Sequence, residues 1–339
     1  MLDANARIAV AGAGSIGCYV GGCLALARRN VLFLARPRIE ASLRAHGLRV
    51  SDLDGGDRVI EMAKSAATAD PATAFRDADI VLVTVKSGAS EAMARLIADH
   101  APRHAVIVSL QNGVDNAERI GSVIGRPVLA GMVPFNVVLS PADDGPLHVR
   151  RASGGTVLVG SGAAGLAELL SVEGCRVEPR ADMKAVLWGK LLFNLNNALV
   201  ALSGLPLAEE LADRRWRMIL ANQIAEALAA MKGAGIEPAA AAGSLKPQWL
   251  PLALRLPDWL FKRLARRMLA IDPSARSSMW DDLELRRATE IDDLQGAVLR
   301  LAARVGARAP TVERVAELVR EAERAAQGSP GFSAKAITG

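Results

Sequence analysis

The 339-residue chain is poor in cysteine, histidine and aromatic residues, and each shortage excludes a class of function. Its three cysteines, Cys18, Cys23 and Cys175, form no metal or redox motif, and their odd number argues against a disulfide framework. The four histidines lack the spacing of a metal site, so we expect no structural or catalytic metal. Aromatic residues, at 4%, are too few for the stacking platforms that bind single-stranded nucleic acid, so we expect no nucleic-acid partner.

The sequence also has little that would suit a membrane or an export pathway. A long charge-free run, residues 191–208, is interrupted by Asn, Ser, Gly and Pro, which does not fit a membrane span. Residues 1–10 lead almost directly into a predicted strand, so we expect no signal peptide. Hydrophobic residues make up 51% of the chain and the net charge is a mild +5, which together favour a cytoplasmic globular protein with a solvated, arginine-rich surface.

A glycine motif stands near the start of the chain. An apolar strand is predicted over residues 8–11, followed at once by Gly12, Gly14 and Gly17 and then by an apolar pattern of helical period. The first glycine suits a tight turn, the second lets a pyrophosphate approach the backbone, and the third lets the helix pack closely on the strand. Because unpaired amides at a helix N-terminus attract anions, this order predicts a dinucleotide-binding site.

Two basic residues follow predicted strands of the same sheet. Arg36 comes after residues 31–35, where a site that prefers NAD would carry Asp or Glu. An arginine there can hold the ribose phosphate of NADP(H), which we predict as the cofactor; the alternative is a surface arginine at a strand end. Lys86 follows the buried apolar strand at residues 79–85 and is expected at the same ligand-binding edge.

Asn112 follows a further buried strand, predicted over residues 105–110. Its side-chain amide is expected at the ligand edge of the sheet, where it could contact both a nicotinamide and a substrate. The alternative is ordinary turn chemistry before Gly113.

The pattern of the chain changes near residue 180. Residues 47–61 indicate a small hairpin, and the segments after residue 127 predict antiparallel strands that finish the sheet. Beyond residue 180 helical periodicity dominates. We therefore expect an α/β Rossmann-like NADP-binding domain over residues 1–180, an all-α domain for substrate binding and catalysis over residues 181–327, and a flexible tail over residues 328–339.

Residues 180–204 predict a largely buried helix with polar residues in its middle. A buried ammonium costs several kcal/mol unless another group offsets it, so Lys190 suggests a functional site. Asn194 lies one helical turn further on and therefore on the same face. The alternative is a lysine that reaches solvent and asparagines that bind one another between packed helices.

A second helix is predicted from Ser277 and Ser278, which are both suitable helix caps, and its amphipathic pattern continues past residue 300. Glu290 falls inside this pattern with apolar neighbours. Considered by itself, a single glutamate is best explained as part of a solvated face.

Six short motifs, in this order and at this spacing, resemble ketopantoate reductases, the 2-dehydropantoate 2-reductases. They are GAGSIG from Gly12, VKS at Lys86, QNG at Asn112, LWGKLLFN at Lys190, SSM at Ser278 and TEID at Glu290. The resemblance covers residues 7 to 325. It implies NADPH-dependent reduction of 2-dehydropantoate to (R)-pantoate on the route to pantothenate and coenzyme A.

The same resemblance implies roles for individual residues. Lys190 would protonate the ketone oxygen, and Glu290 would bind the substrate hydroxyl and orient the lysine. Asn194, Asn197, Asn112 and Ser278 would line the substrate, with Ser278 on its carboxylate. The implied cofactor-binding positions are Gly12, Gly14, Ser15, Ile16, Gly17, Arg36, Lys86, Asn112 and Glu290.

Two positions depart from the family pattern and leave the substrate open. Ala198 and Ala275 stand where family members carry asparagine, and Arg276 could replace a lost contact to the substrate carboxylate. The alternatives are a reductase of another 2-oxo acid, an opine-type dehydrogenase, or an NADP(H) sensor without catalysis. The sequence leaves open whether the helical half pairs with a second subunit as a homodimer.

Overall fold

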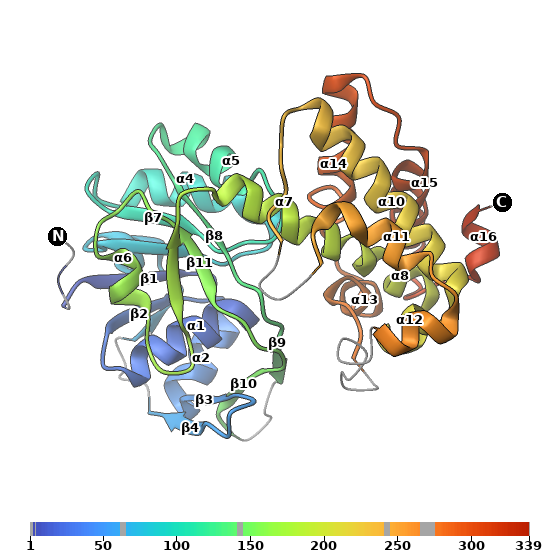
Figure 1. Cartoon of the computed structure of the whole chain (residues 1–339). Coiled ribbons are helices and arrows are strands. Elements are labelled where there is room, and N and C mark those ends of the chain that lie inside the picture. Colours follow the sequence, from blue (N-terminus) through green and yellow to red (C-terminus); the bar gives the residue numbers. More distant parts are fainter. Residues whose placement is uncertain are drawn as a thin grey trace. The chain divides into compact units, whose positions relative to one another are not determined.

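The computed structural model describes residues 3, 5–61, 66–140, 145–240, 245–264 and 275–338. The chain divides into two compact units, Met1–Met183 and Lys184–Gly339. The first unit is an α/β domain with a largely parallel sheet, and the second is helical, which confirms the predicted fold class (Figure 1).

An eight-stranded sheet forms the centre of the first unit. Its strands are β1 (Arg7–Ala11), β2 (Asn30–Leu34), β5 (Ala67–Thr68), β6 (Ile80–Val83), β7 (Val106–Ser109), β8 (Leu129–Met132), β11 (Val157–Gly160) and β12 (Val177–Arg180). They lie in the order β12-β11-β8-β7-β6-β1-β2-β5. Each neighbouring pair is parallel except β11 and β8.

The order of the strands reverses at β1. The chain passes from β1 to β2 on one side and later returns to place β6 on the other side. In an open α/β sheet such a reversal leaves a crevice at the carboxyl ends of the strands, where ligands bind. The segments that follow β1, β2 and β6 therefore share one edge of the sheet.

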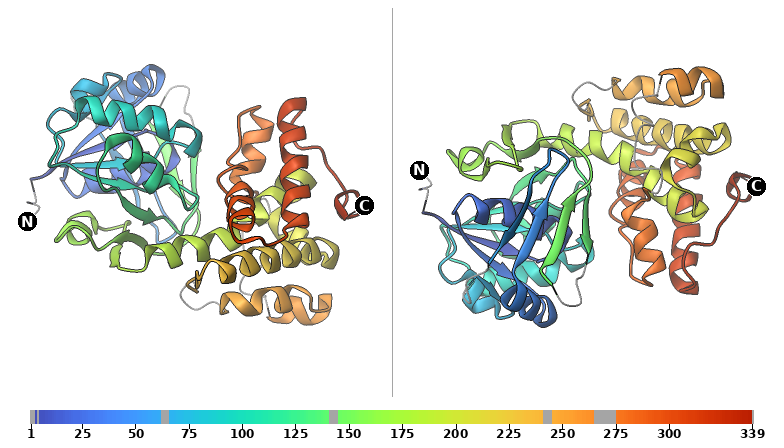
Figure 2. Two further views of the ribbon diagram at one scale, coloured as in Figure 1. Left: turned by 90° about the horizontal axis from the view of Figure 1, so that it is seen from above. Right: turned by 90° about the horizontal axis from the view of Figure 1, so that it is seen from below.

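Helices cover both faces of this sheet (Figure 2). They are α1 (Ser15–Leu26), α2 (Pro37–His46), α3 (Pro71–Phe75), η1 (Ser87–Ala89), α4 (Ser90–His100), α5 (Asn116–Ile124) and α6 (Leu166–Leu170). Alternate residues of β1 enter different cores: Ile8 and Val10 pack with α1, whereas Ala9 and Ala11 pack on the face covered by α3, α4 and α5. Burial on both faces explains why the strands are almost continuously apolar.

A second sheet of four strands lies against α1. Its members are β3 (Leu48–Ser51), β4 (Asp57–Ile60), β9 (Val137–Ser140) and β10 (Leu147–Arg151), in the order β4-β3-β10-β9. The predicted hairpin at residues 47–61 is confirmed, since β3 and β4 pair antiparallel. Part of the turn between β9 and β10, residues 141–144, lies outside the described residues.

The expectation that the strands after residue 127 finish the main sheet was wrong for β9 and β10. Only β8, β11 and β12 join that sheet, and β8 does so in parallel. β10 instead pairs parallel with β3, so that Leu147 and Val149 are buried beside Leu48 and Val50. This arrangement covers the apolar side of α1 that the main sheet leaves open.

The second unit is organised around a long central helix, α10 (Arg214–Gly233), which contacts most of its other helices (Figure 1). The other helices of this unit are α7 (Met183–Asn194), α8 (Asn196–Ser203), α9 (Leu207–Ala212), η2 (Pro247–Trp249), α11 (Leu250–Leu254), α12 (Asp258–Leu264), α13 (Ser278–Glu284), α14 (Gln295–Val305), α15 (Pro310–Ala325) and α16 (Ala334–Thr338).

A buried arginine joins α10 to the segment that follows it. Arg217 is fully buried, and its guanidinium donates to the carbonyl oxygens of Leu211, Leu254 and Leu256 at 2.9–3.1 Å. It also pairs with the Asp258 carboxylate at 2.7 Å and lies 4.2 Å from the Phe261 ring centroid. The planar fork of donors thus satisfies acceptors that burial would otherwise leave unpaired.

The predicted helix at residues 180–204 is confirmed as largely buried, with one interruption. Among the described residues, Met183–Ser203 is the stretch long and apolar enough to cross a membrane, but 72% of its apolar window is buried inside the protein, as in a core helix. The interruption is at Leu195, whose carbonyl oxygen accepts a bond from the Gln295 amide at 2.9 Å. A side chain that hydrogen-bonds to a helix carbonyl in place of the N–H four residues further on is a known cause of helix breaks.

The prediction of one helix from Ser277 past residue 300 was wrong. α13 ends at Glu284, α14 begins at Gln295, and Glu290 lies in the irregular segment between them. Arg286 has a left-handed φ of 52°, and the N–H groups of Arg286 and Arg287 return to the carbonyls of Leu283 and Asp282. This helix-ending motif normally uses glycine, so the arginine gave no sequence signal.

The expected flexible tail is packed instead. The Ser329 hydroxyl donates to the Ala201 carbonyl at 2.7 Å, its N–H donates to the Glu284 carboxylate, and the Phe332 N–H donates to the Leu202 carbonyl. Ala334 and Ile337 in α16 are buried. Two apolar side chains and three hydrogen bonds are enough to order a terminal segment that is otherwise rich in small and polar residues.

Candidate functional site

The glycine loop after β1 has the geometry that dinucleotide binding requires. Gly12 has φ +115°, and a Cβ there would lie 2.7 Å from Val85 Cγ1. A Cβ on Gly17 would lie 2.1 Å from the Gly12 carbonyl oxygen, so the helix could not approach the loop with any larger residue. A Cβ on Gly14 would meet nothing within 4 Å, which leaves this part of the backbone open to a ligand.

The N-terminus of α1 is suited to an anion. No side chain in the described part of the chain caps it, and its first turn, which includes Ser15, Ile16 and Gly17, contains no acidic residue. The first amides of a helix point outward and carry partial positive charge, so a phosphate is the natural group to satisfy them. The loop and the helix end together are suited to the pyrophosphate of a dinucleotide.

Arg36 and Lys86 lie at the same edge of the sheet as this loop. Arg36 follows β2 and precedes α2, Lys86 follows β6, and both side chains are exposed. β2 and β6 are the two parallel neighbours of β1, so their carboxyl ends flank the glycine loop. A guanidinium in place of the acidic residue of an NAD site leaves no carboxylate at this point to repel a ribose phosphate.

Asn112 belongs to a buried hydrogen-bond network that sequence reasoning missed. The main-chain carbonyl oxygen of Asn112 accepts hydrogen bonds from the Ser87 hydroxyl and from the Asn116 side-chain amide. Asn116 also donates to Ser87 and accepts from the Ser90 hydroxyl, at 2.9 and 2.8 Å. The Gln111 amide donates to the Val85 carbonyl at 2.9 Å. The network ties the loop after β6, with Lys86, to the loop after β7, with Asn112.

The members of this network gave no clear sequence signal. Ser87, Ser90, Gln111 and Asn116 are at most 6% exposed, although each is of a type common on surfaces. A buried polar group is retained only where it is paired, and the pairing here joins residues up to 29 positions apart. Such partners become visible only when the strands are placed side by side.

In the second unit, Lys190 and Glu290 are brought within electrostatic reach of each other, although 100 residues separate them. Lys190 is partly buried in α7, and this burial lowers the pKa of its ammonium from 10.5 to about 8, while the charge of Glu290 acts to raise it. A pKa lowered by this much means that the environment disfavours the charged form of the lysine, relative to the neutral form, by roughly 3 kcal/mol. The lysine is thus still mostly protonated at pH 7, but close to titration.

The residue before Lys190 lets a neighbouring backbone segment pack directly against α7. A Cβ on Gly189 would lie 2.1 Å from the Ala239 carbonyl oxygen, and the Ala239 N–H donates to the Ala185 carbonyl at 2.9 Å. The backbone near residue 239 therefore lies directly on α7, one residue from the lysine. Only glycine allows this approach.

The asparagines of this region differ in their surroundings. Asn196 is buried, and its amide donates to the Glu210 carboxyl at 3.0 Å. Burial raises the pKa of Glu210 to about 8, and the pair is a contact within the core. Asn194, at the end of α7, and Asn197, in α8, are only partly buried. These two, unlike Asn196, remain candidates for ligand contact.

The two serines of the SSM motif separate into different roles. The Ser277 hydroxyl caps α13 by accepting from the Trp280 N–H at 3.2 Å and donates to the Asn197 carbonyl at 2.9 Å. It therefore joins α13 to α8. Ser278 is exposed at the first position of α13, where its hydroxyl can reach a ligand.

The positions that depart from the family pattern are not alike in the structure. Ala198 is fully buried in α8, whereas Ala275 is partly exposed. The Arg276 Nε donates to the Gly204 carbonyl at 3.3 Å, and its guanidinium lies 4.7 Å from the Trp280 ring centroid. Arg276 is thus held by neighbours in its own unit, and a contact to substrate stays a prediction.

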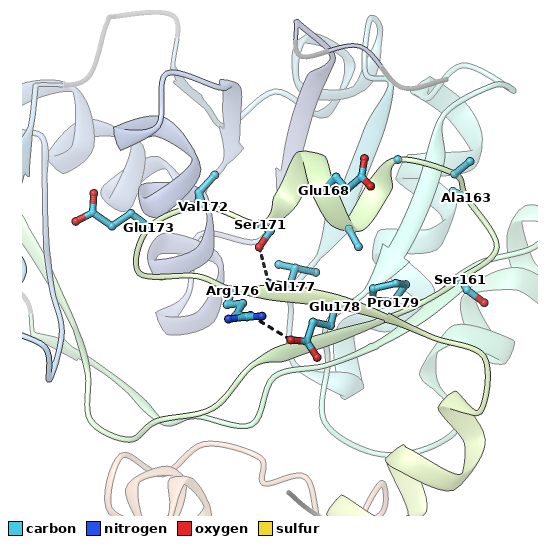
Figure 3. A pocket seen from close by; sticks show the side chains of 13 residues that line it. Ser161, Ala163, Glu168, Ser171, Val172, Glu173, Arg176, Val177, Glu178 and Pro179 are labelled. Atoms are coloured by element: carbon cyan, nitrogen blue, oxygen red, sulfur yellow. Dashed lines mark hydrogen bonds and ion pairs between the residues drawn. The ribbon is translucent and has the colours of Figure 1, made fainter.

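Within the described ranges, no group of three or more His, Cys, Asp or Glu side chains could hold a metal ion. A surface pocket of about 770 Å³ lies beside α6 and β12 (Figure 3). None of the residues proposed from the sequence lines it. Two of its polar side chains are already engaged, since Arg176 donates to Glu178 and the Ser171 hydroxyl accepts from the Val177 N–H.

Solved structures of low sequence identity share this fold. D-mandelate dehydrogenase, solved with NADH and anilino(oxo)acetate, is 20% identical with a TM-score of 0.75 and covers 95% of this chain and 100% of its own. The dimeric ketopantoate reductase of Staphylococcus aureus is 15% identical with a TM-score of 0.70, covering 94% and 99%. At these identities the likeness shows the fold alone.

Closer matches define the family. The sequence profile of ketopantoate reductase PanE/ApbA matches residues 8–164, and that of its C-terminal domain matches residues 182–323. A 2-dehydropantoate 2-reductase of Halobacterium salinarum is 30% identical over 94% of this chain and 99% of its own length. A PanE/ApbA family ketopantoate reductase of Ralstonia eutropha JMP134 is also 30% identical, with a TM-score of 0.79 over 95% and 99% of the two chains. The chain therefore belongs to the ketopantoate reductase PanE/ApbA family.

Proposed function

We propose that this protein reduces 2-dehydropantoate to (R)-pantoate with NADPH, a step towards pantothenate and coenzyme A. The observation that carries the proposal is the partly buried Lys190 ammonium in the electrostatic reach of Glu290. The glycine loop and uncapped helix end of the first unit support it, because they fit a dinucleotide. Relatives that match over nearly the whole chain are named 2-dehydropantoate 2-reductases.

In this proposal Lys190 is the acid of the reaction. A bound nicotinamide dinucleotide supplies the hydride, and the ketone oxygen gains negative charge as the hydride arrives. The Lys190 ammonium stabilises that charge through a hydrogen bond and then gives up its proton to the oxygen. One such donor commonly contributes about 2.7–4 kcal/mol to lowering the barrier.

The other polar residues of the second unit orient the lysine and the substrate. Glu290 opposes the effect of burial on Lys190, so more of the lysine remains in the protonated form that the reduction needs. Glu290 can also accept a bond from the substrate hydroxyl. Asn194, Asn197 and the exposed Ser278 hydroxyl supply neutral donors and acceptors, with Ser278 assigned to the substrate carboxylate.

We assign the cofactor as NADP(H) on the strength of Arg36. Charge-assisted bonds from a guanidinium to a phosphate contribute roughly 1.5–3 kcal/mol each, which corresponds to about a ten- to hundredfold preference. Asn112 and Lys86 would contact the nicotinamide and ribose portions. Their loops are held in place by the buried network around Asn116.

Replacing Arg36 tests this assignment. In Arg36→Ala the dissociation constant for NADPH should rise about ten- to a hundredfold, while that for NADH should change little, because only NADPH carries the ribose phosphate. Cofactor fluorescence titration measures both constants. Arg95→Ala, which removes an exposed arginine on α4, is the matched control and should leave both unchanged. An equal increase in the dissociation constants for NADPH and NADH would show that Arg36 does not bind the ribose phosphate.

The substrate assignment is tested by a panel of 2-oxo acids, including 2-dehydropantoate, assayed with NADPH and ranked by kcat/KM. We expect 2-dehydropantoate to rank first. A higher value for another 2-oxo acid would favour the alternative reductase, which Ala198 and Ala275 keep open. Turnover that requires an amine co-substrate would indicate an opine-type dehydrogenase. Tight NADPH binding without any turnover would indicate a sensor.

Removing the proposed acid should abolish most of the activity. In Lys190→Ala, kcat should fall at least a hundredfold, since about 2.7 kcal/mol of barrier stabilisation is lost. NADPH binding should persist, because the glycine loop is untouched. Lys184→Ala removes an exposed lysine from the same helix and should behave as wild type. Turnover near the wild-type value in Lys190→Ala would exclude this role.

The pH dependence of reduction should follow Lys190. Because the protonated form is the active one and its pKa is about 8, kcat/KM should be highest below this value and fall as the pH rises through it. Glu290→Gln removes the charge that raises this pKa, so the falling limb should move to lower pH. A limb that stays in place or moves to higher pH would contradict the coupling.

A further inference from the structure

Gln295, the first residue of α14, connects the two segments that carry Lys190 and Glu290. Its side chain is fully buried. The amide nitrogen donates to the Leu195 carbonyl oxygen at 2.9 Å and to the Gln223 Oε1 at 3.1 Å. The first of these bonds spans 100 positions of sequence and ends at the break between α7 and α8.

On one side, the Leu195 carbonyl is closely linked to the lysine. The Leu195 N–H still bonds to the Leu191 carbonyl at 3.0 Å, so the helix that carries Lys190 and Asn194 runs without interruption up to this residue. Its carbonyl, however, is taken by Gln295. The amide therefore holds the end of α7 at a fixed point.

On the other side, a compact turn links Gln295 to Glu290. The Glu290 carbonyl accepts from the N–H groups of Asp293 and Leu294, both at 3.0 Å. Ile291 and Leu294 are each 1% exposed, so the turn is anchored in the core. A turn with two internal hydrogen bonds and two buried anchors transmits the position of Gln295 to Glu290 with little freedom.

Stability alone does not explain a polar pair at this place. Gln295 Oε1 and Gln223 Nε2 are buried without a hydrogen-bond partner in the described part of the chain. Each such group costs about 1–3 kcal/mol, and replacing a buried polar pair by apolar residues of similar shape is often neutral or stabilising. The pair therefore stabilises the fold less than an apolar pair of similar shape could.

We propose that Gln295 is a positioning residue that sets the separation between the Lys190 ammonium and the Glu290 carboxylate by tying the end of α7 to the start of α14. The inference rests on the proposed function for its catalytic consequence. The charge of Glu290 acts on Lys190, and the interaction between two charges falls as they separate. Loss of the Leu195 bond should therefore weaken the coupling without removing either charged group.

The test replaces the amide by an apolar chain of similar length, in Gln295→Met. We expect kcat to fall about ten- to a hundredfold, the scale expected when a reacting group is displaced by about 1 Å. The falling limb of the pH profile should shift to lower pH, as in Glu290→Gln. The melting temperature should fall by a few degrees, because the Leu195 carbonyl and the Gln223 amide lose a buried partner, and the dissociation constant for NADPH should be unchanged.

Gln223→Met is the matched control. It removes the second partner of Gln295 from the same buried pair but leaves the bond to Leu195. Its kcat and pH profile should match those of the wild type. The proposal is overturned if Gln295→Met keeps the wild-type pH profile, or if both variants lose activity equally.

A readout independent of turnover separates this inference from the proposed function. The Lys190 titration can be followed by carbon-13 NMR of labelled lysine side chains, with Lys190→Arg to assign the signal. In Gln295→Met the Lys190 signal should titrate at lower pH than in the wild type and in Gln223→Met. If the protein reduces none of the 2-oxo acids, the proposed function fails, whereas an unshifted lysine titration would refute the role of Gln295.

Discussion

The second unit depends on keeping one ammonium group charged while partly burying it. Burial of Lys190 pulls its pKa from 10.5 to about 8, and the Glu290 carboxylate acts in the opposite direction. The balance requires a fixed separation, and several local features provide it: Gly189 admits the neighbouring backbone, the Leu195 carbonyl binds Gln295, and a compact turn carries Glu290. The helices α8 and α14 pack on α10, and Arg217 bonds α10 to the carbonyl oxygens of Leu211, Leu254 and Leu256.

The first unit meets a simpler constraint, which is to present backbone amides and positive charge at one edge of a parallel sheet. Parallel pairing of β1 with β2 and β6 places the glycine loop, Arg36 and Lys86 at that edge. Close packing at Gly12 and Gly17 sets the shape of the loop, and the open backbone at Gly14 admits a ligand. The buried amides of Gln111 and Asn116 then hold the adjacent loops, so that their positions do not depend on surface side chains.

Sequence reasoning succeeded where a signal was local and failed where a contact was distant. Helical and strand periods identified the fold class, and the pattern of residues 47–61 identified the β3–β4 hairpin. Three expectations were wrong for the same physical reason. Strand β10 pairs with β3 rather than with the main sheet. Arg286 ends a helix in a left-handed conformation, and the C-terminal segment forms hydrogen bonds with α8 and α13. In each case the tertiary structure outweighed the local conformational preference of the segment.

The sequence by itself determined the glycine loop and the order of an α/β half before a helical half, and it contained the residues proposed for acid catalysis. Glycine spacing and apolar periodicity act within a few residues, so they can be recognised along the chain. Only the tertiary structure decided that Ser277 rather than Ser278 caps a helix, that Asn196 belongs to the core, and that Gln295 joins the lysine segment to the glutamate segment. Hydrogen bonds and charge interactions depend on distances in space, and no pattern along the chain encodes a bond between positions 100 residues apart.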